Sequence, residues 1–384
     1  MYATYKCCIL DRHQFIIEPH NQLIVKIIKS ILLLLSAVLL FNKTAIAQLD
    51  YQKEIKQYAK DLNTSFNKVQ QRSSAFEFSD TNRLKWNNLP VGLRPRVGTS
   101  IGNMTEDQRR LVHRILSASL SSQGYLKATS IMHLDELINR FYDSMYYRKE
   151  INEETHKFLI DLLWSPKNYY FAFFGVPGEG NWGYKLEGHH LSINFTFVGD
   201  KISVTPFFIG TDPAEFLYNE YAGLRVLGQE EDLGLKLIQS FTEVQKKKAI
   251  MSGEAPGDII TSAESGKRLI DNWGIKGIDL DENQKATLKG IIREYVFNFE
   301  YEKATIEYNK ILKAGIDNIY FGWIGGQEEK IAHYFVINGP TFLIEFDNNG
   351  GPRNAANHIH TIWREKGNEY GEDVLKKHYI SEKH

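Results

Sequence analysis

The sequence predicts an α+β fold in which an N-terminal layer of helices packs on a mainly antiparallel β-sheet carrying a His-rich polar site. Apolar residues recur at helical spacing up to about residue 164, and they alternate in the manner of strands from residue 169. The same order, helices and then strands, returns in the C-terminal half of the chain. Separate runs of helices and strands are typical of α+β proteins.

The chain begins with the pattern of a secretory signal peptide. Lys26 and Lys29 precede the apolar run 31–41, and Ala45-Ile46-Ala47 follows it. A basic region, a short apolar region and a small-x-small site are the three parts of such a leader. The apolar run is shorter than the roughly 20 residues that a membrane-spanning helix needs.

We therefore expect residues 1–47 to be a leader that is removed on export, which would place the protein in the periplasm or outside the cell as a secreted protein. Residues 1–22 are polar and precede a complete leader. We expect the true start to lie near Leu23, so that residues 1–22 would be a start-site artefact.

Composition narrows the chemistry of the exported chain. Cys7 and Cys8 are the two cysteines, and both precede the apolar run, so a chain beginning at Gln48 has no disulfide and no thiolate ligand. Any metal would be bound by His, Asp or Glu.

The formal net charge is −1, which gives no reason to expect nucleic acid or an anionic membrane as a partner. We expect a small-molecule substrate and no integral membrane span in the mature chain; the sequence indicates no oligomeric state.

The first part of the body is predicted to be helical. Residues 51–71 have apolar side chains at helical spacing, and residues 72–102 form an extended connection that Trp86 pins to the body. We assign residues 48–102 to this helix and linker, and residues 103–384 to a single α+β domain.

Three more helices are predicted before the first strands. Thr105 and Gln108 have the spacing of a capping box, in which each side chain hydrogen-bonds the other residue's backbone N–H. The apolar stripe that follows predicts a helix ending near Gly124. Residues 127–146 and 152–164 predict the next two helices.

The sequence then alternates between two classes of element. The first predicted meander has strands at 169–174, 183–186, 190–198 and 202–209, with a tight turn at Gly199-Asp200. Helices follow at 230–242, continuing to 251, and at 281–312; a second meander has strands at 319–323, 331–337 and 341–346, with 358–363 as a further strand and 370–378 as a terminal helix.

The stretch Gly-His-His-Leu-Ser-Ile-Asn-Phe at 188–195 is the first candidate site. If it is a strand, His190, Ser192 and Asn194 share one face, and His189 shares the other with apolar residues. The polar face has two interpretations: the solvent-facing side of a sheet, or the floor of a polar site in which His190 is the principal group.

The pair His358-Ile359-His360 is the second candidate. In an extended strand both imidazoles lie on one face, where they can bind one metal ion. Glu345 and Asp347 lie upstream, and the Gly- and Asn-rich segment between them and the histidines can turn sharply. We predict a metal centre formed by His190, His358 and His360, with Glu345 or Asp347 as a fourth ligand or base and His189 in reserve.

The metal would be a divalent zinc, copper or iron ion, since imidazole suits all three. Without a metal, a histidine beside a carboxylate could perform acid–base chemistry. Asn194 and Asn357 are predicted to orient the substrate, and Ser192 to be a hydrogen-bonding neighbour. Arg364 could bind an anionic group, although a surface salt bridge is its simpler interpretation.

Several long motifs occur together in this chain, among them Ala-Asn-His-Ile-His at 356–360. The others are at 182–195 and 339–348, with 108–110 and 120–125 in the helical part. From about residue 86 to residue 379 the chain resembles the domain-of-unknown-function 3500 family. The resemblance implies that these motifs belong to one domain, and it implies no particular reaction. Residues 349–353 are an insertion-like departure just before the histidine pair.

The sequence favours a metal-dependent enzyme, specifically a hydrolase, in which the metal activates water or polarises a carbonyl. An oxidative copper or iron site is an alternative. A different class is a non-catalytic protein of the cell envelope that binds a small molecule or a partner, and a third is a structural envelope protein. Convergence of the ring nitrogens on one point would distinguish a metal site from the binding protein and from the structural protein.

Overall fold

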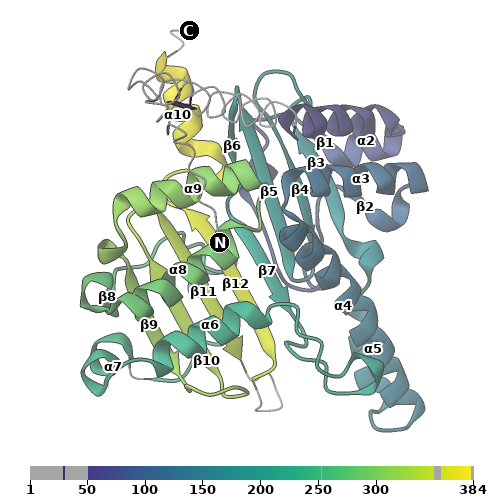
Figure 1. The fold of residues 1–384 in the computed structure, drawn as a ribbon. Helices are drawn as coiled ribbons and strands as arrows, with labels where there is room; N and C mark the ends of the chain where they lie inside the picture. The colour runs from purple at the N-terminus through teal and green to yellow at the C-terminus, as the bar shows by residue number, and fades with distance from the viewer. Residues whose placement is uncertain (1–28, 31–50, 252, 350–355, 382–384) are drawn as a thin grey trace, which may run out of the picture. The chain divides into compact units, whose positions relative to one another are not determined.

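The computed structural model describes residues 29–30, 51–251, 253–349 and 356–381 (Figure 1). The chain falls into two compact units, Met1–Tyr51 and Gln52–His384, and the second contains the whole described sheet. The predicted leader, 1–47, lies outside the described residues except for 29 and 30, so the signal peptide stays a prediction. Within the described part, no helix is both long and apolar enough to cross a membrane.

The α+β prediction is confirmed: helices alternate in blocks with the strands of one large sheet. The helices are residues 52–65, α2 (Lys68–Ser74), α3 (Glu106–Ser119), α4 (Ser122–Tyr147), α5 (Glu153–Asp161), α6 (Gly228–Gln239), α7 (Glu243–Ala249), α8 (Glu282–Val296), α9 (Tyr301–Ala314) and α10 (Glu372–Ser381).

The sheet of the described chain has 12 strands, and its pairings are antiparallel except that of β1 with β3. The order is β1-β3-β4-β5-β7-β12-β11-β10-β9-β8, with β2 beside β3 and β6 beside β5. The strands are β1 (Ala75–Phe76), β2 (Thr99–Ser100), β3 (Tyr170–Phe174), β4 (Trp182–Gly188), β5 (Leu191–Val198), β6 (Lys201–Ser203), β7 (Phe207–Thr211), β8 (Ile275–Lys276), β9 (Tyr320–Gly325), β10 (His333–Asn338), β11 (Phe342–Asn349) and β12 (His358–Glu365).

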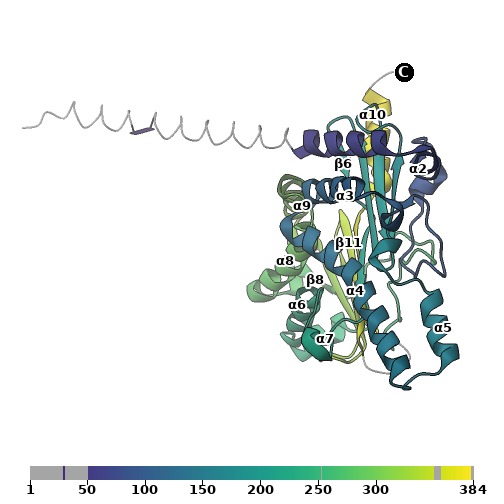
Figure 2. The same ribbon diagram turned by 90° about the vertical axis from the view of Figure 1, so that its right-hand side faces the viewer.

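Helices cover one face of this sheet. Figures 1 and 2 show α6, α8 and α9 together on one side of the C-terminal strands. Tyr295 of α8 and Thr361 of β12 are joined by a hydrogen bond of 2.7 Å between their hydroxyls. Farther along the sheet, Tyr184 of β4 donates to Ser119 of α3 at 2.6 Å. These contacts place the helical layer and the thick aromatic core on the same face.

Two coil segments, residues 77–98 and 253–273, cover the opposite face, which we call the coil-covered face. Trp86 of the first segment packs on Phe208 of β7, with ring centroids 5.1 Å apart. Backbone N–H groups of the second segment donate to the buried carboxylate of Glu345 on β11. Apart from the short 3-10 helix Thr81–Leu84 in the first segment, neither segment has regular structure, so their positions depend on such side-chain contacts.

Some predicted elements were too long because a cap divides them. The predicted helix 51–71 is interrupted at Asn67, whose side chain accepts from the N–H groups of Val69 and Gln70 and so begins α2. The predicted helix 281–312 is two helices, since Glu300 caps α9 in the same way. Gly124, predicted to end a helix, lies inside α4.

The predicted strand 202–209 was also wrong, because it is two strands. β6 ends at Ser203 and β7 begins at Phe207, and Pro206 lies between them. Proline has no N–H to donate to a neighbouring strand, so it interrupts the ladder. β6 pairs with one end of β5, and β7 pairs with the other.

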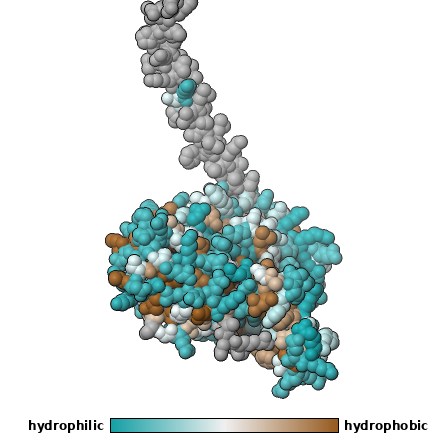
Figure 3. Space-filling view, turned by 60° about the horizontal axis from the view of Figure 1, so that its bottom comes forward, coloured by the Kyte–Doolittle hydropathy of each residue, from teal (hydrophilic) through white to brown (hydrophobic). Residues whose placement is uncertain are grey.

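Figure 3 shows one face of the molecule, on which apolar residues are scattered among hydrophilic ones. Scattered apolar residues of this kind are ordinary on a protein surface and mark no docking site.

Candidate metal centre

The pairing of β7 with β12 brings the histidines together from distant parts of the sequence. β7 lies between β5 and β12, and Gly210 of β7 faces His360 in the register. His190 immediately precedes β5, and its carbonyl accepts from the N–H of Gly210 at 2.8 Å. His190 and His360 therefore lie on either side of a glycine.

That glycine permits the two rings to approach each other. A Cβ atom at Gly210 would lie 3.1 Å from Cδ2 of His190 and 3.2 Å from Cδ2 of His360. It would also lie 2.6 Å from the carbonyl oxygen of Ile359, which is closer than real Cβ atoms come. A larger residue would thus push the histidines apart.

His190 lies in a turn, not in a strand as the sequence predicted. β4 and β5 form a hairpin whose last pair is Gly188 with Leu191, so His189 and His190 are its two-residue turn. His190 has a φ of 57°, in the left-handed region, and its N–H donates to the carbonyl of Asn88. The turn, rather than strand alternation, directs the His190 side chain.

The Nε2 atoms of three histidines converge. Nε2 of His190 lies 2.8 Å from that of His358 and 3.1 Å from that of His360. Two nitrogens bound to one tetrahedral zinc ion would be about 3.3 Å apart, given bonds of about 2.0–2.1 Å. The spacing of the rings is close to that of a shared metal ion, and these three histidines can hold one.

The group of side chains that can hold a metal contains no carboxylate. Its ligand atoms lie within 4.8 Å of one another, and within the described residues only these three histidines form such a group. Glu345 and Asp347, our predicted fourth ligands, are outside it. A water molecule or a substrate atom would have to complete four-coordination.

A carboxylate fixes the orientation of one ring. Nδ1 of His360 lies 2.7 Å from Oδ1 of Asp258, in the coil segment 253–273. A proton on Nδ1 donates to this carboxylate, which leaves Nε2 of a neutral His360 with a lone pair. A carboxylate behind a ligating histidine is the usual second contact in metal sites.

Hydrogen bonds among the three rings cannot replace a cation. Nε2 of a neutral His360 has only a lone pair to offer, and Nε2 of His190 faces both other rings. His190 Nε2 carries at most one proton, and that proton can form a full hydrogen bond with only one of the two neighbouring rings. The other Nε2···Nε2 contact then has no proton from His190. A cation at the centre would accept all three lone pairs.

The protonation state suits a metal ligand. Burial, with the neighbouring imidazoles, holds the pKa of His190 and the pKa of His358 well below the usual value for histidine. Both rings are therefore neutral near pH 7, and neutral imidazole is the form that binds metal ions.

His189 forms a separate polar contact beside the triad. Its Nδ1 lies 2.6 Å from Oδ1 of Asp135 on α4, and the Tyr169 hydroxyl donates to Oδ2 of the same carboxylate at 2.9 Å. The ring of His189 stacks on that of His190, with centroids 3.7 Å apart. Asp135 thus fixes the proton of His189 on Nδ1 and leaves Nε2 as a base.

Asp347 lies directly opposite His360 on the neighbouring strand. Its Oδ2 accepts from Nδ2 of Asn349 at 3.0 Å, and its Oδ1 has no hydrogen-bond partner in the described part of the chain. Burial raises the pKa of Asp347 to about 6. A carboxyl group with that pKa can exchange a proton near neutral pH.

Glu345 is bound to the covering segment. Its carboxylate accepts from the N–H groups of Ile260 and Thr261, at 2.6 and 3.1 Å, and from the Tyr334 hydroxyl at 2.8 Å. Burial raises its pKa, while these donors act in the opposite direction. The contacts give Glu345 a role in holding residues 253–273 on the sheet.

Ser192 and Asn194 share one buried face, so the solvent-facing interpretation of this strand was wrong: their exposures are 0% and 4%. Ser192 donates to the carboxylate of Glu187, and Asn194 donates to the carbonyl of Pro206. These contacts hold both side chains within the fold.

Asn357 and Arg364 also have partners. Asn357 accepts from the N–H of Glu215 and donates to its carbonyl, which ties β12 to a loop. Arg364 is 2% exposed and donates to Thr261 and to Glu369, so it forms a buried ion pair rather than the surface one.

Sequence reasoning missed Asp258, Asp135 and Gly210. Asp258 and Gly210 are isolated residues without a motif, and Asp135 is one polar position in a long helix. Each matters only through a neighbour that is remote in the sequence. Local patterns therefore had no signal for them.

The comparisons with known proteins agree with the motifs. No curated protein and no solved structure matches the chain. One family model, described as "Protein of unknown function (DUF3500)", matches residues 50–372, which include every element of the site. The chain belongs to the DUF3500 family of proteins of unknown function.

Proposed function

We propose that this protein binds a divalent transition-metal ion through His190, His358 and His360 and uses it to hydrolyse a small-molecule substrate. The convergence of the three Nε2 atoms carries the proposal, because a cation at the centre would accept a lone pair from each neutral ring, whereas hydrogen bonds among the rings leave one contact unpaired. Zinc, copper and iron all suit imidazole ligands.

Two nearby groups support catalysis rather than binding alone. A metal ion in such a site supplies Lewis acidity, which polarises a carbonyl or lowers the pKa of a water molecule. His189, oriented by Asp135 through Nδ1, has a lone pair on Nε2 that can accept a proton. Asp347, with its pKa of about 6, can donate one.

A substrate panel tests the hydrolase proposal. The protein would be loaded with zinc and assayed on p-nitrophenyl acetate, p-nitrophenyl phosphate and bis-p-nitrophenyl phosphate. We expect at least one to be hydrolysed, and the rate to fall at least about 100-fold in the variant His358→Ala/His360→Ala. The control His113→Ala/His133→Ala removes two exposed histidines elsewhere and should keep the rate.

The burial of the triad favours a second candidate, a non-catalytic metal or small-molecule binding protein of the cell envelope. His190 and His360 are only 3% and 6% exposed, which leaves little room for a substrate. Stoichiometric metal without hydrolysis of any ester in the panel would favour this candidate.

We also propose export. The basic, apolar and small-residue pattern of residues 26–47 supports it. N-terminal sequencing of protein produced in a host with a secretory pathway would show Gln48 as the first residue, and an uncleaved N-terminus would contradict it.

A further inference from the structure

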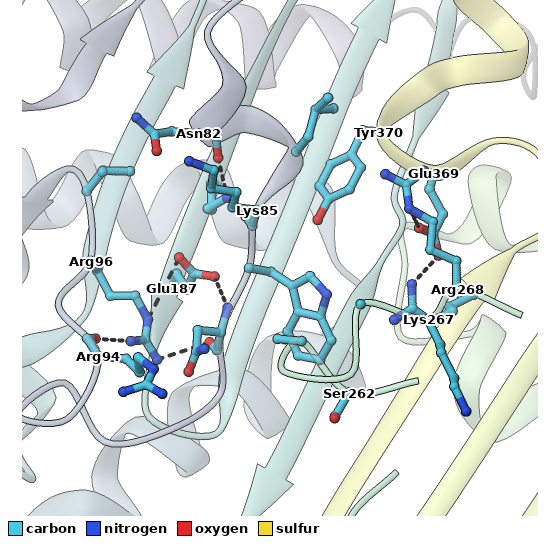
Figure 4. A pocket seen from close by; sticks show the side chains of 18 of the residues that line it. Asn82, Lys85, Arg94, Arg96, Glu187, Ser262, Lys267, Arg268, Glu369 and Tyr370 are labelled. Atoms are coloured by element: carbon cyan, nitrogen blue, oxygen red, sulfur yellow. Dashed lines mark hydrogen bonds and ion pairs between the residues drawn. The ribbon is translucent and has the colours of Figure 1, made fainter. Parts of the chain in front are cut away.

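A polar cavity lies on the coil-covered face, and its lining includes none of the three histidines. Its volume is about 450 Å³, within the range of small-molecule sites. Figure 4 shows Arg94 and Arg96 on one side of it and Arg268 and Glu369 on the other. The lining comes from the segments 82–97 and 262–268, from β4 and β12, and from η8 (Glu369–Gly371).

The lining is strongly basic. Seven of its residues are basic and two are acidic: Lys85, Arg94, Arg96, Lys185, Lys267, Arg268 and Arg364 against Glu187 and Glu369. Glu264 and Glu372 pair with Arg94 and Arg268 at the rim. Even when both are counted, three positive charges remain in excess. Such an excess in a concave site attracts anions.

The acidic residues of the lining already have partners. Glu187 accepts from the N–H of Asn87 at 2.7 Å and from Ser192 at 3.2 Å. Glu369 pairs with Arg364 and lies 3.3 Å from Arg268. Each carboxylate is thus already paired with a cation of the lining, Glu187 with Arg96 at 3.8 Å and Glu369 with Arg364.

Two lysines at the rim have free ammonium groups. Lys85 and Lys267 are exposed, and within the described chain no carboxylate pairs with either. The buried ammonium of Lys185 donates only to backbone carbonyls, those of Asn82 and Lys85. The three excess positive charges of the cavity therefore have no carboxylate to balance them within the described chain.

Two buried donors of the wall also lack an acceptor. The Tyr370 hydroxyl points toward the middle of the cavity in Figure 4 and has no hydrogen-bond partner among the described residues. The same holds for Nε of Arg96, whose nearest carboxylate oxygen, on Glu187, is 3.8 Å away. Buried donors without acceptors are uncommon in folded proteins.

The cavity also has an aromatic wall. Trp86 lines it and is backed by Phe208, while the guanidinium of Arg364 lies 5.8 Å from the Trp86 ring centre. An aromatic surface beside several cations suits a ligand with both an apolar or ring-shaped body and a negative group.

We propose that this cavity binds a small organic anion, one that carries a carboxylate or a phosphate group on a compact body. The site is separate from the triad. Arg364 and His360 are four residues apart on β12, about 13 Å along the strand, and the buried cluster of Phe208, Ile259 and Ile362 packs on the same face. The proposal does not rest on metal binding.

Calorimetric titration of the purified protein at low ionic strength tests it. The probes are citrate, D-glucuronate and glucose 6-phosphate, with inorganic phosphate as a bare anion and D-glucose as a neutral body. We expect at least one organic anion to bind and D-glucose not to bind. The bound anion should bind more weakly at higher salt, because screening reduces attraction at an exposed rim.

Matched variants locate the site. Lys85→Gln/Lys267→Gln removes the two free rim charges, and we expect it to weaken binding about tenfold, the effect of losing one charge-assisted hydrogen bond. Lys157→Gln/Lys313→Gln removes two exposed lysines on α5 and α9 and should bind as the wild type does.

Three results would overturn the proposal: no probe binds, the anion binds equally well to the rim variant, or inorganic phosphate binds as tightly as every organic anion. The variant His358→Ala/His360→Ala should retain the affinity for the anion. Loss of metal with retained anion binding would therefore support a cavity that is independent of the metal centre.

Discussion

Asp258 determines which nitrogen of His360 is available to a metal. Its carboxylate accepts from Nδ1, so that Nε2 faces the other rings. We predict that Asp258→Ala lowers metal affinity about 10–100-fold, the usual effect of removing such a partner. Competition with a chromophoric chelator measures this. Asp271→Ala, an exposed aspartate of the same segment, should have no effect, and equal affinities for both variants would contradict the role of Asp258.

The lowered pKa values of His190 and His358 predict how metal binding depends on pH. Protons compete with a metal only below the pKa of the ligand, and burial moves both values well below about 6.5. Metal should therefore stay bound when the pH falls from 8 to 6 and be released only in stronger acid. Dialysis at a series of pH values, followed by metal analysis, measures it. Release of half the metal between pH 7 and 6.5 would contradict the prediction.

At the scale of single residues, the sequence predicted the three histidines but not the residues that orient them. His358 and His360 could be recognised because side chains two residues apart on a strand point to the same face. His190 was identified by its polar neighbours, although its backbone is a left-handed turn. Asp258 could not be found, since its contact with His360 spans 102 residues and depends on an irregular segment.

Among the elements, β7 controls the approach of the rings. We predict that Gly210→Ala weakens metal binding at least about tenfold and lowers the unfolding temperature, because the added Cβ meets a backbone carbonyl and both rings. Thermal denaturation and metal titration measure the two effects.

Gly290→Ala is the matched control. A Cβ at Gly290, on α8, would have its nearest neighbour at 4.0 Å, an ordinary contact. Alanine stabilises a helix interior by about 0.5–1 kcal/mol relative to glycine, so this variant should be slightly more stable and bind metal normally. A Gly210→Ala variant that behaves in the same way would contradict the packing argument.

Helices and strands could be predicted where neighbouring residues formed a recognisable motif, such as a helix cap. The capping box at Thr105 is present as predicted, with Gln108 as its partner. Boundaries were missed where one side chain stops one helix and begins the next, as at Asn67 and Glu300. The order of the strands could not be predicted, because the pairing of β7 with β12 joins segments about 150 residues apart in sequence.

At the scale of the molecule, the site depends on a segment without regular structure. Glu345 holds this segment through the N–H groups of Ile260 and Thr261, and Asp258 lies just before them. We predict that Glu345→Ala lowers the free energy of unfolding by about 3 kcal/mol, because it leaves several buried donors without an acceptor.

The same variant should also speed hydrogen exchange at residues 258–261 and weaken metal binding through Asp258. Denaturation and exchange measured by mass spectrometry test both. Glu328→Ala, at an exposed position, is the control. Unchanged exchange in Glu345→Ala would show that other contacts hold the segment.

The central claim is that the three histidines form one metal centre, and metal content tests it most directly. The protein would be produced from Gln48 onward without a His tag, incubated with zinc, copper or iron, dialysed, and measured by elemental mass spectrometry. We predict about one metal ion per chain in the wild type and in His113→Ala/His133→Ala, and almost none in His358→Ala/His360→Ala. A wild type that stays empty with all three metals, or a triad variant that keeps its metal, would contradict the claim.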